Sequence, residues 1–517
     1  MPDARRKLPI GVQTFAQIVS EDYYYVDKTA LAHQLAEEGK YYFLSRPRRF
    51  GKSLFLDTLK ELFEGNEPLF RGLWIHDRWD WSVHHPVIRI SFGSGVLHSR
   101  TELDRRIADL LRVNAEALGV GIPNDLDIVG RFSELIRRTH AQTGQRIVVL
   151  IDEYDKPILD NLTDRETALT MREGLKNLYS VLKDADAALR FVFLTGVSKF
   201  SKVSLFSGLN NLMDLTLSRP YSAICGYTET DIDTVFAPEL AGLDRDAIRH
   251  WYNGYRWLGE AVYNPFDVLL LFAEREFRPW WFETGTPTFL VNLLAERGFF
   301  TPNLARLRTG PELLSTFDVD HIATEALLFQ TGYLTILHAD EPIRGHWIYT
   351  LGYPNHEVES SLNISLLGVY TGGDPSRSMN QRLRLLDLLL AHDLTGMKDL
   401  FQSFFASIPH QWYDNNPISH YEGYYASVFY SYFAALGLDI ILEDATNPGR
   451  IDMTVLFQEH IYLFEFNVVE LSAEGQALQQ IKDKGYADKY RSLGQPIHLI
   501  GVEFSRASRN IVRFEVG

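Results

Sequence analysis

The nine residues Ser45–Ser53 have the types and the order needed to hold a nucleoside triphosphate. They read Ser-Arg-Pro-Arg-Arg-Phe-Gly-Lys-Ser and lie between an apolar run, 41–44, and a helix-forming stretch. In such a loop the backbone N–H groups and the helix N-terminus face the phosphates. Arg46 stands where the first glycine of the usual G-x-x-x-x-G-K-[ST] spacing belongs, so the motif needs a partner. We expect the Lys52 ammonium to contact the β- and γ-phosphates and the Ser53 hydroxyl to bind Mg²⁺. The expected nucleotide contacts are Arg49, Phe50, Gly51, Lys52 and Ser53.

The partner motif is an apolar, β-branched run, 146–151, that ends in Asp152 and Glu153. Such a run is typical of a buried parallel strand, and an acid at its carboxyl end faces the crevice where α/β proteins bind ligands. Asp152 is expected to hold Mg²⁺ through water, and Glu153 to polarise the attacking water. A core strand that stops at a solvated acidic turn is the alternative. In this order and context the two motifs together favour nucleotide binding.

Further apolar runs at 87–92 and 191–196 predict two more strands of the same sheet. Helical spacing of apolar residues at 175–182 lies between the acidic strand and the last one, which predicts a parallel sheet covered on both faces. Thr195 or Ser198, at the end of the last strand, is a candidate sensor of the γ-phosphate. A plain loop after the strand is an equal alternative.

The pattern of residues changes after residue 225. Residues 226–300 are helical and aromatic and predict a lid, in which Arg256 is weighed as a phosphate contact against an ordinary surface arginine. Residues 301–380 mix helices with short strand-like pieces, which predicts a small helix-plus-hairpin linking module, winged-helix-like in character.

Composition bounds the class of protein. The chain has 517 residues, a net charge of −16 and no long apolar run, which predicts several globular domains and no membrane span. Cys225 is the only cysteine, so a disulfide framework is excluded, a thiolate metal site is implausible, and a reducing cytoplasm fits. The acidic balance argues against a chain coated for nucleic acid, although a local basic groove stays open.

The last hundred residues read as a helix, three strands, a helix and a strand. If 458–459 is a short hairpin loop, antiparallel register places Asp452 directly opposite Glu465, and Asn467 shares a face with Glu465. Two carboxylates that close favour a divalent metal between them, and Glu422 on the preceding helix is a candidate third acid. A pair of solvent-exposed edge acids is the alternative, and spacing alone leaves the two even.

Several strings together resemble the AAA-ATPase-like family of bacterial proteins, whose members carry a C-terminal domain of the PD-(D/E)XK nuclease superfamily. The resemblance spans essentially the whole chain, and its most specific string, Arg46–Ser53, also accounts for Arg46, because an arginine-proline entry to the loop is what the family shows. The strings that carry it are Tyr25–Thr29, Arg46–Ser53, Ile151–Asp155, Gly332–Thr335, Pro354–Val358, Gly449–Asp452 and Phe464–Phe466.

The resemblance implies an α/β fold in four parts. These are a P-loop ATPase core with a parallel sheet (1–225), a helical lid (226–300), the linking module (301–380) and a restriction-endonuclease-like α/β domain (381–517). It also implies ATP and Mg²⁺ as cofactors, Asp452 and Glu465 as metal ligands, and DNA or RNA as a partner of the last domain. A membrane is not expected, and the oligomeric state, a homo-oligomer included, stays open.

One residue departs from the family's nuclease motif, which asks for lysine where this chain has Asn467. Lys482 or Lys484 is a candidate substitute, since some members relocate this lysine, but both are also ordinary solvated helix positions. Residues 401–517 hold 8 Lys and Arg against 14 Asp and Glu, a balance that disfavours tight nonspecific DNA binding. We therefore expect an ATPase coupled to a nuclease-like domain in genome defence or DNA processing. The alternatives are a nucleotide-dependent switch with an inactive nuclease fold used for binding, and a scaffold that binds nucleotide without hydrolysis.

Overall fold

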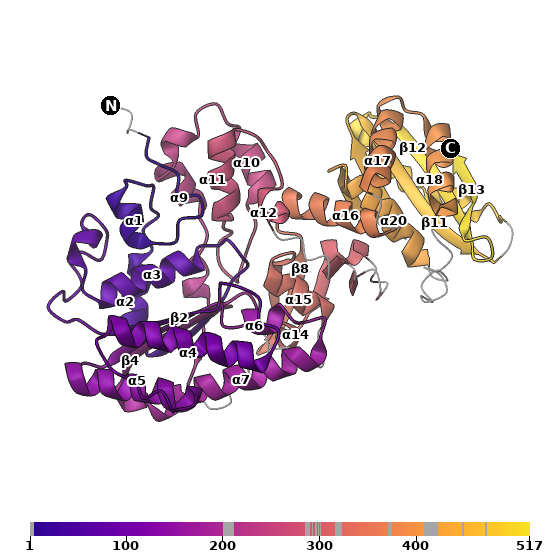
Figure 1. Ribbon diagram of the computed structural model, residues 1–517. Coiled ribbons are helices and arrows are strands. Elements are labelled where there is room, and N and C mark those ends of the chain that lie inside the picture. The colour runs from indigo at the N-terminus through magenta and orange to yellow at the C-terminus, as the bar shows by residue number, and fades with distance from the viewer. Residues whose placement is uncertain are drawn as a thin grey trace. The chain divides into compact units, whose positions relative to one another are not determined.

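The chain divides into two units in the computed structural model shown in Figure 1. The first unit comprises Met1–Thr284 and Arg308–Asn355, and the second comprises Gly285–Leu307 and His356–Gly517. The predicted boundaries at 225, 300 and 380 stay predictions. The described residues are 5–199, 211–284, 301–315, 323–370, 375–407, 422–446, 449–470 and 473–517, with 290, 291, 293, 294, 297 and 299.

A five-stranded sheet with all its strands parallel forms the centre of the first unit, in the order β2-β3-β4-β1-β5. Four of its strands confirm the sequence prediction, whereas the two-residue β5 was missed because so short a strand carries no periodicity. Parallel strands end at one edge of a sheet, so the phosphate loop after β1 and the acids after β3 lie at the same edge. The strands are β1 Tyr41–Ser45, β2 Val87–Ser91, β3 Ile147–Asp152, β4 Leu189–Gly196 and β5 Met213–Asp214.

Helices cover both faces of this sheet, as predicted from the strand–helix alternation. Figure 1 shows α4, α5 and α7 along one face and α2 and α3 on the other, the arrangement that right-handed crossovers give. The helices are α1 Phe15–Ser20, α2 Thr29–Glu38, α3 Lys52–Phe63, α4 Arg100–Ala117, α5 Ile128–Thr143, α6 Lys156–Leu159 and α7 Arg165–Asp184.

A group of short helices follows the sheet, which agrees with the predicted helical texture. Their apolar core also takes in Tyr24 and Val26 from the beginning of the chain. The Tyr24 hydroxyl donates to the Glu239 carboxylate at 3.1 Å within the same group. The N-terminal segment therefore packs as part of this helical group. The helices are α9 Glu229–Thr234, α10 Arg245–Tyr252, α11 Pro265–Glu274 and α12 Trp280–Glu283.

The predicted helix-plus-hairpin module has a three-stranded sheet in the order β6-β8-β7, in which β7 and β8 are antiparallel. Two helices precede the hairpin, and Gly332 ends the second of them in the left-handed conformation with φ +95°. The elements are β6 Leu307–Thr309, α14 Pro311–Ser315, α15 Thr324–Thr331, β7 Thr335–Ile343 and β8 His346–Gly352.

The second unit has a mixed sheet in the order β13-β12-β11-β10-β9, in which only β11 and β12 run parallel. The predicted succession of a helix, three strands, a helix and a strand is present, with β13 as an additional edge strand. The second helix of that succession is short, Gln476–Asp483, because Gly485 after it is in the left-handed conformation, φ +56°, and breaks it. The elements are α16 His356–Tyr370, α17 Pro375–Leu390, α18 Leu394–Ala406, α20 Glu422–Ala434, β9 Asp439–Thr446, β10 Gly449–Phe457, β11 His460–Val469, α21 Gln476–Asp483, β12 Ile497–Ser505 and β13 Asn510–Val516.

Arg46 holds the phosphate loop in place from inside the first unit. Its side chain is fully buried, and its guanidinium donates to the carbonyls of Ser45, Thr216, Tyr221 and Ser222 at 2.8–3.3 Å. The guanidinium also lies 4.0 Å from the centre of the Trp257 ring. Burial lowers the pKa of Arg46 to about 10, so the group stays charged at neutral pH. In place of a flexible glycine, the loop therefore has a cationic anchor.

We predict that Arg46→Gly, which restores the usual loop glycine, destabilises the first unit by about 3 kcal/mol or more, because it leaves several buried carbonyls without donors. Denaturant unfolding of the full chain, followed by tryptophan fluorescence, measures this loss. Arg105→Ala, at an exposed position of α4, is the matched control and should leave the unfolding midpoint unchanged. An Arg46→Gly protein as stable as the wild type would contradict the anchoring role.

Candidate functional site

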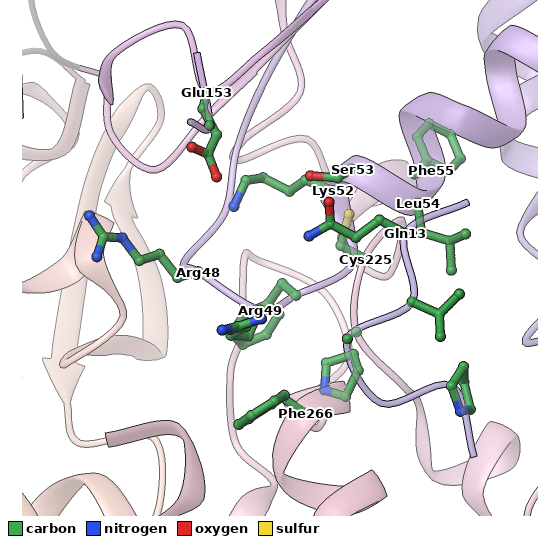
Figure 2. A pocket seen from close by; sticks show the side chains of 18 of the residues that line it. Gln13, Arg48, Arg49, Lys52, Ser53, Leu54, Phe55, Glu153, Cys225 and Phe266 are labelled. Atoms are coloured by element: carbon green, nitrogen blue, oxygen red, sulfur yellow. The ribbon is translucent and has the colours of Figure 1, made fainter. Parts of the chain in front are cut away.

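A pocket of about 520 Å³ opens at the carboxyl edge of the parallel sheet. This volume lies in the usual range for small-molecule sites, roughly 300–1,000 Å³. The pocket is lined by the phosphate loop, by Glu153, by the segment Cys225–Tyr227 and by residues of α11, with the N-terminal stretch at 9–13 on another side (Figure 2). Of the predicted nucleotide contacts, it contains Arg49, Phe50, Gly51, Lys52 and Ser53.

The end of the loop is shaped for a phosphate group. Gly51 has φ +89° and is the N-cap of α3, so the loop turns directly into the first helical N–H groups. No side chain caps this helix end, which leaves its N–H groups available to an anion. Lys52 is buried, and its ammonium donates to the carbonyls of Arg46 and Pro47 at 2.9 and 2.8 Å. The loop therefore combines a helix N-terminus with a buried cation.

Asp152 lies behind the pocket and is bonded to the neighbouring strand. The Thr195 hydroxyl donates to its carboxylate at 2.7 Å, and both residues are buried. Burial lowers the pKa of Lys52, and the charge of Asp152 opposes that effect. The structure thus places Asp152 and Thr195 at the ends of β3 and β4 and Lys52 at the start of α3, with the Thr195 hydroxyl on the acid. The role of Thr195 as a sensor of the γ-phosphate stays a prediction.

Glu153 points into the pocket from the turn after β3 (Figure 2). Its backbone is left-handed, φ +53°, an unusual conformation for a residue with a side chain. Its carboxylate lies beside Gly93, where an added Cβ would come within 3.3 Å of Oε2. Burial raises the pKa of Glu153, whereas the charges of Lys52 and Arg48 lower it. A carboxylate whose pKa is raised by burial is a stronger base than an exposed one.

Ser198 supports a different acid from the one that Thr195 holds. Its N–H and hydroxyl donate to the Asp155 carboxylate at 2.7 and 2.6 Å, and the Val197 N–H donates at 3.3 Å. Burial raises the pKa of Asp155, and these donors oppose the shift. Asp155 therefore fixes the loop after β4. Sequence analysis named Asp155 only within the string Ile151–Asp155, because nothing in its local pattern marks this contact.

The other residues that line the pocket were not predicted from the sequence. Gln13, Cys225 and Phe266 line it from three separate segments, and the Arg49 guanidinium lies 4.9 Å from the Phe266 ring centre. Asn264, the N-cap of α11, is a helix-start signal that the sequence shows, but nothing in the sequence indicates that α11 lies next to the phosphate loop. Arg256 is exposed and does not line the pocket; its backbone bonds to Thr335.

The second candidate site lies on the β10–β11 hairpin, whose predicted register is confirmed. Phe457 pairs with His460, and the ladder runs back to Met453 opposite Phe464. One step further, the Asp452 carboxylate accepts the Phe466 N–H at 2.8 Å. Burial raises the pKa of Asp452. Register thus brings Asp452 to the neighbourhood of Glu465.

Helix α21 closes over the same end of the hairpin. Gln480 on this helix donates to the Glu465 carboxylate, and the Asn467 amide, oriented to satisfy both its ends, accepts the Ala477 N–H at 3.2 Å. Glu503 on β12 accepts N–H groups at the start of α21, at 2.8 and 2.7 Å. Although burial acts to raise it, the pKa of Glu503 is lowered by these donors. Asn467 and Glu503 therefore hold the start of α21. The role of Glu503 was missed because no other acid pairs with it in the sequence pattern.

The two candidate lysines lie in different places. The Lys482 side chain lies against Gly517 at the end of the chain. The pKa of Lys484 is raised by a hydrogen bond with Tyr486 and further by the charges of Glu465 and Asp452. Glu422 begins α20, but its side chain lies outside the described residues.

The metal ligands expected at Asp452 and Glu465 stay a prediction, and the side chain of Glu422, the candidate third acid, lies outside the described residues. Across the described residues, no group of three or more His, Cys, Asp or Glu side chains is arranged to hold a metal ion. Within the same residues, no helix is long and apolar enough to cross a membrane.

Comparisons with known proteins find a match for each of the two parts of the chain that carry these sites. Residues 9–206 match the family described as "Predicted AAA-ATPase", and residues 420–514 match the PD-(D/E)XK nuclease superfamily. An "Uncharacterized protein in vnfD 5'region" from Azotobacter chroococcum mcd 1 is 66% identical over 514 residues, which is 99% of each chain. No solved structure matches. The chain therefore belongs to the AAA-ATPase-like family whose members end in a PD-(D/E)XK nuclease-superfamily domain.

Proposed function

We propose that the first unit binds ATP and hydrolyses it to ADP and phosphate. The observation that carries the proposal is the placement of Lys52 and Glu153 in one pocket, at the edge where β1 and β3 end. A buried cation beside a helix N-terminus suits the phosphates, and a carboxylate with a raised pKa suits the attacking water. The family assignment supports nucleotide binding independently.

The loop residues divide the work of binding. The N–H groups at the start of α3 and the Lys52 ammonium bind the β- and γ-phosphates. To do so, the ammonium gives up its hydrogen bonds to the Arg46 and Pro47 carbonyls. Ser53 and Asp152 are the residues that would hold Mg²⁺, which neutralises phosphate charge when bound. Thr195 keeps the Asp152 carboxylate in one orientation.

Glu153 performs the proton step. It orients a water toward the γ-phosphorus and accepts its proton as the new P–O bond forms and the bond to the ADP oxygen breaks. The bond electrons leave with ADP, and phosphate is released. The raised pKa of Glu153 makes it a stronger base than an exposed glutamate.

We predict that Lys52→Ala abolishes detectable ATP binding and that Glu153→Gln binds ATP but hydrolyses it about 10²–10⁴-fold more slowly. Phosphate release and equilibrium binding of a fluorescent ATP measure the two effects separately. Glu37→Gln, at an exposed position of α2, is the matched control. Equal rates in all four proteins would reject hydrolysis at this site.

The pH profile gives a further test. Because Glu153 must be ionised to accept a proton, kcat should fall as the pH drops through its pKa, which lies above the ordinary value of 4.5. We predict an acid limb above pH 4.5 in the wild type and none in Glu153→Gln. Steady-state rates in overlapping buffers measure it. An identical acid limb in both proteins would assign the titration to another group.

For the second unit we propose a nucleic-acid-binding role that the nucleotide state of the first unit controls, in DNA processing or defence. The contacts of Asn467 and Glu465 with α21 favour a nuclease fold used for binding. Metal-dependent cleavage is the second candidate, favoured by the charge of Lys484 beside Asp452 and Glu465. In that reading, Lys484 takes the place of the motif lysine.

The two candidates predict different results in a nicking assay with labelled DNA and RNA, Mg²⁺ and ATP. For the binding role, we expect no cutting by the wild type and retained binding in a gel shift. Cleavage predicts nicking that both Asp452→Ala and Lys484→Ala abolish, while Lys482→Ala, beside the chain end, keeps it. Nicking that survives Asp452→Ala would come from a contaminant.

A further inference from the structure

The phosphate loop contains three arginines, and the structure gives each a different environment. Arg46 is buried among backbone carbonyls. Arg49 stacks on Phe266 of the lid. Arg48 is exposed into the pocket, and among the described residues no hydrogen-bond or ion-pair partner of its side chain is found. Arg48 is therefore the loop arginine whose charge is available to a ligand.

The backbone of Arg48 is fixed although its side chain is exposed. Its carbonyl accepts the Trp281 indole N–H at 3.0 Å. The preceding Pro47 packs so closely on Gly332 that a Cβ there would come within 2.7 Å of the proline ring. Fixing the start of a long side chain reduces the entropy that it loses when it binds. The loop thus presents a guanidinium from a rigid base.

Arg48 also lies on the catalytic side of the pocket. Figure 2 shows Arg48 and Lys52 extending from the loop on the side where Glu153 lies, away from Phe266. The charges of Lys52 and Arg48 both act on the Glu153 carboxylate. A γ-phosphoryl group attacked by a water on Glu153 must lie next to that carboxylate. Its oxygens would then be within the influence of both cations.

We propose that Arg48 is an arginine finger supplied in cis: it contacts the γ-phosphoryl group of ATP bound to its own chain. The inference rests on the proposed ATPase and adds its missing charge-stabilising group. Guanidinium groups bind phosphoryl oxygens in a planar, two-pronged geometry, and a finger stabilises the charge of those oxygens in the transition state. Each chain therefore hydrolyses ATP without an arginine from a second copy.

The first test compares Arg48→Ala and Arg48→Lys with the wild type. We expect Arg48→Ala to lower kcat about 10³-fold or more, and Arg48→Lys to restore little of it. Affinity for ADP should stay within about twofold, while affinity for a non-hydrolysable ATP analogue falls about tenfold, since only the analogue carries the γ-group. Arg105→Ala is the control for losing an exposed arginine. Equal losses of affinity for ADP and the analogue would overturn the γ-phosphate contact.

The second test separates cis from trans action. A mixture of Arg48→Ala and Glu153→Gln chains lacks any chain with both groups, so it should stay inactive if the finger acts in cis. Activity recovered on mixing, or a wild-type rate per chain that rises with protein concentration, would overturn the proposal in favour of a finger in trans. A wild type that releases no phosphate would reject the proposed ATPase, and the two binding affinities would still decide the Arg48 contact.

Discussion

The buried Arg46 guanidinium is the interaction on which the nucleotide pocket depends. It bonds backbone carbonyls from the strand that enters the loop and from the segment at 216–222, and it faces the Trp257 ring. A cation that leaves water for an interior must replace its hydration with oriented dipoles, and carbonyl groups supply them. The loop is thereby tied to the chain that leads into the lid. A glycine allows a phosphate loop to turn freely, whereas this arginine makes the loop's position depend on its surroundings.

Much of the first unit was predictable from the sequence, because its signals are local. Apolar runs of strand length located β1 to β4, and the Gly51–Ser53 and Asp152–Glu153 strings located the two ends of the site. The pocket's other walls, such as Gln13 and Phe266, come from segments whose positions depend on tertiary packing. The difference between Arg46, Arg48 and Arg49 was equally invisible. Three identical residue types acquire separate roles only when their neighbours are known.

In the second unit, period-two geometry predicted the hairpin register correctly from a loop of two residues. Sequence reasoning saw Asn467 only as a missing lysine. The structure adds that its amide, together with Glu503, holds the start of α21, and that Gln480 of that helix reaches Glu465. The residues around the acids therefore hold α21 in place, a structural role that competes with a catalytic one. Replacing Asn467 with a charged residue therefore alters the packing of α21 as well as the charge near the acids.

The core that helices α9 to α11 share with the N-terminal segment has a consequence for how the chain reaches its fold. Tyr24 meets Glu239, which is 215 positions later in the sequence, so the earliest part of the chain must wait for a much later part to be synthesised. Contacts between such distant residues form slowly, because a long loop has to close first. Meanwhile Tyr24 and Val26 expose apolar surface that only α9 to α11 can cover. A fragment that stops after the parallel sheet would keep that surface exposed, with self-association as the expected result.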